Sequence, residues 1–154
     1  MDKEPITLDA DVETSLAGAL FNAVWTLLEN ASRTPDDDLR MIHMAHASRY
    51  HWSRVGTQVH AVRGEWQCSR VYATLGRSEP ALFHARRALE ICEANEIGDF
   101  DLAFCYEAIA RAHAVAGDID EARQWQLRGL KLVNDVTDDE DREILAADLA
   151  SVPI

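Results

Sequence analysis

The sequence predicts an all-α protein that forms a single domain over residues 1–154. Three observations favour this class: apolar residues recur at helical spacing, turn residues separate the apolar segments, and no alternating apolar run carries a hairpin signal. With 47% hydrophobic and 27% charged residues, the composition is that of a globular domain and not of a disordered polypeptide. A polypeptide of about 150 residues also buries enough surface to need no disulfide or metal.

Self-similarity at an offset of about 41 residues divides the sequence into units. The aligned pairs include Trp66 with Trp25, His84 with His43, and Gly76 with Gly117. A fixed offset of this length is typical of stacked supersecondary repeats. It predicts three units, at about residues 16–56, 57–97 and 98–138.

Each unit is expected to hold two helices, because a short break of turn and capping residues divides it. The breaks are, in order, Thr34-Pro35-Asp36, Gly76-Arg77-Ser78 and Gly117-Asp118. Thr137 and Glu140 have the spacing of a capping box, which predicts a last helix at about residues 138–150. The protein should therefore contain three helix pairs followed by one terminal helix.

The second unit carries a resemblance to a known repeat family. Its break and second helix contain Tyr72-Ala73-Thr74-Leu75-Gly76, then Pro80-Ala81-Leu82, then Ala88-Leu89-Glu90-Ile91. These segments resemble the second half of a tetratricopeptide repeat (TPR), although the period is about 41 residues instead of the usual 34. The resemblance implies a right-handed α-solenoid of three longer-helix repeats with a C-terminal capping helix. It also implies a protein-interaction module that binds a peptide or partner protein in a concave groove.

In such solenoids the first helix of each pair faces the groove. Helical spacing on residues 57–77 leaves a narrow polar face of arginines between two apolar flanks. The repeat offset carries this face to the other units, where Phe104 is among the equivalent positions expected on the concave surface. The predicted groove residues are Asn22, Glu29, Arg63, Trp66, Gln67, Arg70, Arg77 and Arg111. For Trp25 and Trp66, a repeated core position is the favoured interpretation over a stacking platform.

Charge is unevenly distributed along the sequence. Residues 40–87 hold eight arginines against two acids, whereas residues 1–39 and 88–154 are strongly acidic. Because arginine binds carboxylates well, one hypothesis is that Arg63 and Arg70 capture an acidic peptide or the terminal carboxylate of a partner. The alternative is that these arginines pair with acids of neighbouring repeats, such as Glu29 and Glu107.

Two histidine-containing clusters are candidate small-ligand sites. Arg49, His51, Trp52 and Arg54 could form a small-anion or metabolite pocket, but ordinary packing between helices is the favoured interpretation. His43 and His46 have the spacing of a ligand pair on one helical face, yet no third and fourth ligand is evident. The offset instead predicts a half-buried His43 and an exposed His46, so no metal site is expected.

Homodimerisation is a further alternative to groove binding. The first helix has no preceding repeat to cover its apolar residues, which could form a dimer seam. These residues are Leu20, Phe21, Val24, Leu27 and Leu28.

Several function classes are excluded or disfavoured by the sequence. A net charge of −12 argues against nucleic-acid and anionic-membrane binding, and the thirteen-residue apolar stretch 16–28 is too short to span a bilayer. No catalytic or cofactor-binding motif occurs, so neither an enzyme nor a cofactor is predicted. The acidic N-terminus lacks signal-peptide features, which predicts a cytoplasmic protein. The three cysteines, which have no CxxC spacing, are expected to be buried free thiols.

Overall fold

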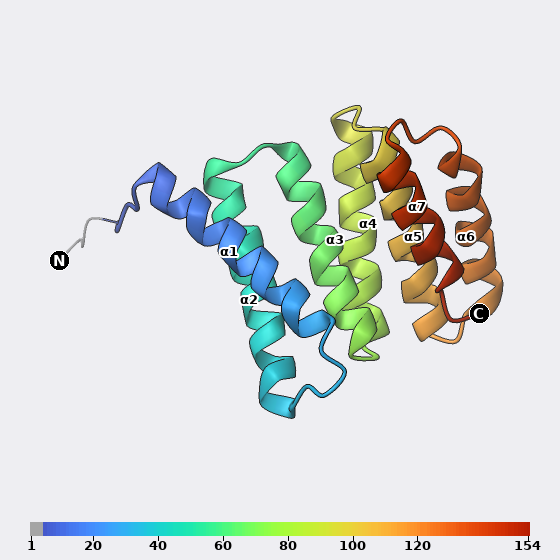
Figure 1. The fold of residues 1–154 in the computed structure, drawn as a ribbon, viewed down its shortest axis with the longest axis horizontal. Coiled ribbons are helices and arrows are strands. Elements are labelled where there is room, and N and C mark those ends of the chain that lie inside the picture. The colour runs from blue at the N-terminus through green and yellow to red at the C-terminus, as the bar shows by residue number, and fades with distance from the viewer. Residues whose placement is uncertain (1–4) are drawn as a thin grey trace.

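The computed structural model describes residues 5–154, and this part of the protein is all-α, as predicted (Figure 1). Its helices are α1 (Ala10–Leu28), α2 (Pro35–Val55), α3 (Gln58–Thr74), α4 (Ser78–Ala94), α5 (Asp99–Val115), α6 (Ile119–Val133) and α7 (Asp139–Ala150). Helix α1 begins earlier than the apolar pattern predicts, because the side chain of Asp9 accepts hydrogen bonds from the backbone N–H groups of Asp11 and Val12.

The helices pack in sequence order. Each helix contacts the next one, and α1, α3, α5 and α7 also contact one another in succession. Figure 1 shows α1 at one end of the molecule and α7 lying beside α5 and α6 at the other end. The odd-numbered helices therefore form a continuous surface, which positions the candidate site.

The turns after α3 and α5 have the same geometry. Gly76 and Gly117 adopt positive φ angles of 71° and 81°. The following residue donates a backbone hydrogen bond to the carbonyl five residues earlier in both turns, Arg77 to Tyr72 and Asp118 to His113, each over 2.9 Å. This is a Schellman ending, which favours glycine because a Cβ disfavours the left-handed conformation.

The connections before α2 and α7 differ from these turns. Before α2, Thr34 and Asp37 form a reciprocal capping box with distances of 3.2 and 3.0 Å. Before α7, the predicted capping box of Thr137 is wrong, because Asp138 caps the helix by accepting from the N–H of Asp141 over 2.9 Å. The hydroxyl of Thr137 instead donates to the carboxylate of Asp99 over 2.9 Å, which ties the entry of α7 to the start of α5.

The core is built from small side chains between neighbouring helices. Five alanines of α5 are buried where this helix packs closely on its neighbours, together with larger side chains such as Phe104 and Ile109. All three cysteines are free and buried, as predicted. The side chains of Leu145 and Leu149 are fully buried on the inner face of α7. Each contributes on the order of 2 kcal/mol to stability.

The apolar face of α1 is largely covered within the protein. Val24 is fully buried, and Leu27 and Leu28 pack with it against Met41 and Val71. These three residues of the expected dimer seam thus have intramolecular partners in α2 and α3. Within residues 5–154, no helix is both long enough and apolar enough to cross a bilayer.

Candidate functional site

A concave cavity of about 490 Å³ lies between the four odd-numbered helices, and we call it the aromatic groove. It is lined by Phe21 and Trp25 of α1, Val62, Arg63 and Trp66 of α3, Phe100, Asp101 and Phe104 of α5, and Asp141, Ile144 and Asp148 of α7. Its volume falls in the range of about 300 to 1,000 Å³ that is typical of ligand pockets.

A line of ring contacts crosses the groove from α1 to α5. The ring centroids of Trp25 and Trp66 lie 5.4 Å apart, and Trp66 meets Phe104 edge to face at 5.4 Å. Phe21 and Phe100 extend the line at its two ends, with centroid distances of 6.5 and 4.5 Å to their neighbours Trp25 and Phe104. The rings therefore form one continuous line of apolar contacts, in which Phe104 is buried and the other four rings are half-buried.

Acidic side chains outnumber basic ones in the groove lining. Arg63 binds both carboxylate oxygens of Asp101, at 2.9 and 3.3 Å, and this hydrogen bonding raises the pKa of Arg63. Asp148 contacts Arg70 over a longer distance of 3.5 Å. Asp141 forms no ion pair with any residue that the structure places. The wall supplied by α7 is therefore incompletely neutralised.

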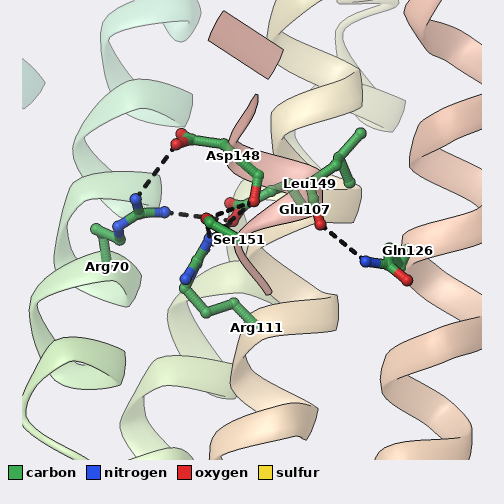
Figure 2. A network of polar contacts seen from close by, with 7 residues as sticks. All are labelled: Arg70, Glu107, Arg111, Gln126, Asp148, Leu149 and Ser151. Carbon is green, nitrogen blue, oxygen red and sulfur yellow. Dashed lines mark hydrogen bonds and ion pairs between the residues drawn. The ribbon is translucent and has the colours of Figure 1, made fainter. Parts of the chain in front are cut away.

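A buried ion cluster lies next to the groove, centred on Glu107 (Figure 2). Glu107 is completely buried, and its Oε1 accepts hydrogen bonds from Arg111 over 2.7 Å and from Arg70 over 3.2 Å. Its Oε2 has no hydrogen-bond partner in the described part of the protein. Burial raises the pKa of Glu107, although both arginines act in the opposite direction.

The ion cluster holds the C-terminal end of α7 in place. Arg111 donates to the carbonyl of Asp148 over 3.0 Å and to the hydroxyl of Ser151 over 2.8 Å. Gln126 of α6 donates to the carbonyl of Leu149 over 2.8 Å, as Figure 2 also shows. These bonds tie the last carbonyls and the C-cap of α7 to α5 and α6, in addition to the backbone bonds that Ser151 and Val152 donate to the same carbonyls. They also fix the α7 wall of the groove.

The predicted groove residues divide into three groups. Arg63 and Trp66 line the groove, whereas Arg70 and Arg111 belong to the ion cluster beside it. The predicted alternative of internal pairing is present for Arg70 with Glu107, whereas Glu29 forms no ion pair among the residues described.

The remaining predicted groove residues lie elsewhere. Gln67 is fully buried and donates to the carbonyl of Phe21 over 3.0 Å. Asn22, with Trp52 and His60, lines a smaller recess that shares Phe21 and Arg63 with the aromatic groove. Glu29 is exposed at the C-cap of α1, and Arg77 is exposed over the ring of Tyr72. The polar face predicted on α3 therefore does not form one binding surface.

Phe104, which the repeat offset predicts on the concave surface, also lines the groove. The structure adds groove residues that the sequence patterns did not place there: Phe21, Trp25, Val62, Phe100, Asp101, Asp141, Ile144 and Asp148. One signal could have found the rings. Each first helix carries a large apolar pair at i, i+4 spacing, and these pairs are Phe21 and Trp25, Val62 and Trp66, and Phe100 and Phe104. No comparable signal marks the residues from α7.

The cluster from Arg49 to Arg54 does not converge on a pocket. Arg49 pairs with Glu65 over 3.0 Å, whereas His51 and Arg54 both contact Glu13, at 2.9 and 3.0 Å. Trp52 stacks on His60 with a centroid distance of 4.1 Å. The four side chains thus serve three separate contacts between helices.

The environments of the two histidines of α2 are the opposite of those predicted from the offset. His43 is exposed, whereas His46 is half-buried with its Nε2 2.8 Å from the hydroxyl of Tyr72. The reason is that the face of α2 that carries His46 packs on α3, where Cys68 lies 3.9 Å from its Nδ1. Burial raises the pKa of Cys68 to about 12, so this thiol stays protonated and is a poor nucleophile.

Among the residues that the structure describes, no three His, Cys, Asp or Glu side chains gather in a way that could hold a metal ion. No protein-family model, curated protein or solved structure matches this sequence.

Proposed function

We propose that this protein is a protein-interaction module of three TPR-like repeats and that it binds a partner polypeptide segment in the aromatic groove. The observation that carries the proposal is the line of rings from Phe21 to Phe100, set in a concave cavity of about 490 Å³. Large aromatic side chains supply much of the binding energy at protein interfaces.

The arrangement of the helices supports the repeat architecture in this proposal. Successive helix pairs stack in sequence order, and the turns at Gly76 and Gly117, which occupy equivalent positions of successive units, share φ and hydrogen-bond geometry. In a right-handed solenoid of such pairs the first helices line the concave side. The groove draws on α1, α3 and α5, which are the first helices of the three pairs.

The proposal rests on the aromatic rings of the groove and not on the arginines. Arg63 and Arg70 already bind carboxylates within the protein, so an acidic peptide would have to displace Asp101, Asp148 or Glu107. Replacing an existing intramolecular ion pair gains little, because the liberated carboxylate loses its partner. The apolar ring surface needs no such exchange.

The test is selection of short random peptides, displayed on a carrier, against the folded protein. Binding of selected peptides is then measured for Ile144→Trp, which adds bulk at a groove residue that is 46% exposed. Leu127→Trp is the matched control, because Leu127 is 57% exposed on α6 and does not line the groove.

We expect micromolar dissociation constants that rise at least about tenfold, or about 1.4 kcal/mol, in Ile144→Trp and stay unchanged in Leu127→Trp. Thermal melting verifies that both variants fold. The proposal fails when no peptide is enriched, or when both variants bind the selected peptides as the unmodified protein does.

A further inference from the structure

We infer that the aromatic groove selects a basic segment, in which an arginine or lysine side chain is flanked by apolar residues. This inference rests on the proposed function and specifies the partner class for the same groove. The expected ligand is therefore basic, whereas the arginine-rich middle of the sequence suggested an acidic one.

The lining of the groove carries more negative than positive charge. One basic residue, Arg63, lines the groove together with three carboxylates, from Asp101, Asp141 and Asp148. Asp101 is occupied by Arg63 at 2.9 Å, so the other two aspartates leave an excess of negative charge on α7.

The partners of those two aspartates place the excess on Asp141. Arg70 contacts Asp148 at 3.5 Å and Glu107 at 3.2 Å, and Arg111 also binds Glu107, so two guanidinium groups serve these two carboxylates. Asp141 forms no ion pair within the described range 5–154, although its charge lies close enough to Arg63 to raise the pKa of that guanidinium. A cationic side chain at this wall would complete the pairing, whereas an acidic one would meet like charge.

The opposite side of the groove also favours a cation. Trp25 and Trp66 lie side by side at 5.4 Å, and the face of a tryptophan ring attracts ammonium and guanidinium groups more strongly than that of other aromatic residues. Flanking apolar residues of the same segment would pack on the half-buried ring of Phe100, beside the buried ring of Phe104. Rings from α1, α3 and α5 and carboxylates from α7 thus form complementary walls for one basic side chain.

The charge of the whole protein acts in the same direction. The net charge is −12, which attracts basic segments and repels acidic ones over distances of about a Debye length. Binding of a basic peptide should therefore weaken as salt is raised.

The test uses the same displayed peptide selection, now scored for composition. We expect the groove-dependent peptides, defined by loss of binding to Ile144→Trp, to be enriched in arginine or lysine. Replacing that basic residue with glutamine should weaken binding several-fold, and replacing it with glutamate should weaken it further.

Two variants of the protein locate the effect on α7. Asp141→Asn should weaken the basic peptides about threefold to fivefold, as expected for a partly exposed ion pair. Glu143→Gln is the matched control, since it removes the same charge from an exposed position of the same helix that does not line the groove. Asp141→Arg should reverse the preference and favour the glutamate-substituted peptide.

The outcomes separate this inference from the proposed function. Groove-dependent peptides without basic residues, or equal effects of Asp141→Asn and Glu143→Gln, would overturn the cationic preference and leave groove binding intact. An absence of any groove-dependent peptide would overturn both. Enrichment of basic peptides whose preference reverses in Asp141→Arg would support both.

Discussion

Arg111 and Glu107 lie one turn apart on α5, and Nε of Arg111 donates to Oε1 of Glu107 over 2.7 Å. The carboxylate is completely buried, so its charge depends on Arg111 and Arg70. Because Arg111 also binds the carbonyl of Asp148 and the hydroxyl of Ser151, one guanidinium both neutralises a buried charge and anchors α7. The stability of the groove wall is therefore coupled to this ion pair.

Arg111→Ala should lower the free energy of unfolding by about 3 kcal/mol, because it leaves a buried carboxylate poorly compensated. Urea unfolding followed by circular dichroism measures this loss. Adding Glu107→Gln should recover part of it, since the uncompensated charge is removed. Arg87→Ala is the control, because its pair with Glu90 is exposed and should cost less than about 1 kcal/mol. Equal losses for Arg111→Ala and Arg87→Ala would contradict the buried role of Glu107.

His46 should make stability depend on pH. Burial lowers the pKa of His46, and the nearby charge of His84 lowers it further. Below a pH of about 6.5 the unfolded state takes up a proton that the folded state resists, so the free energy of unfolding falls as the pH falls through this window. The contribution reaches at most about 1.4 kcal/mol per pH unit.

His46→Gln should flatten the pH dependence of urea unfolding between about pH 5 and 7. His43→Gln is the matched control, since His43 is exposed one turn earlier on the same helix. If both variants keep the slope of the unmodified protein, His46 is not the group responsible.

Gly117 should be intolerant of a Cβ for conformational reasons alone. Its φ is 81°, and a Cβ built there would meet no atom within 4 Å. Gly117→Ala is expected to cost about 1 to 2 kcal/mol of unfolding free energy, and Gly117→Asn less, because asparagine tolerates the left-handed region better. Chemical denaturation measures the unfolding free energies of the unmodified protein and the two variants and so checks their order. Alanine and asparagine variants of equal stability would argue against a left-handed turn.

The three cysteines should resist thiol reagents in the folded protein. Cys68, Cys92 and Cys105 are each at most 1% exposed, and burial holds the pKa of Cys68 near 12. Ellman's reagent should therefore label none of them within minutes under native conditions and all of them after addition of denaturant. Rapid labelling of one thiol in the native protein would show that its helix opens readily.

Much of the helical framework follows from local chemistry that the sequence displays. Gly76, Gly117 and Pro35 separate the helices of each pair because their backbone preferences act within a few residues. Burial of the cysteines follows from helical spacing alone.

The charged side chains could not be assigned in the same way. The partners of Arg63 and Arg70 lie 37 to 78 residues away, so their pairing depends on how α5 and α7 pack against α3. The repeat units predicted from the offset end at about residue 138, so the predicted groove did not include α7. His43 and His46 show the same limit, since periodicity defines the faces of a helix but not which neighbour covers each face.

Helix α7 gives the groove a wall through Asp141 and Ile144 while its own Leu145 and Leu149 complete the core. Undocking of α7 would therefore expose that core and remove one wall of the groove in the same event. Any segment that bridged α3 and α7 would oppose this opening, because occupancy stabilises the docked helix.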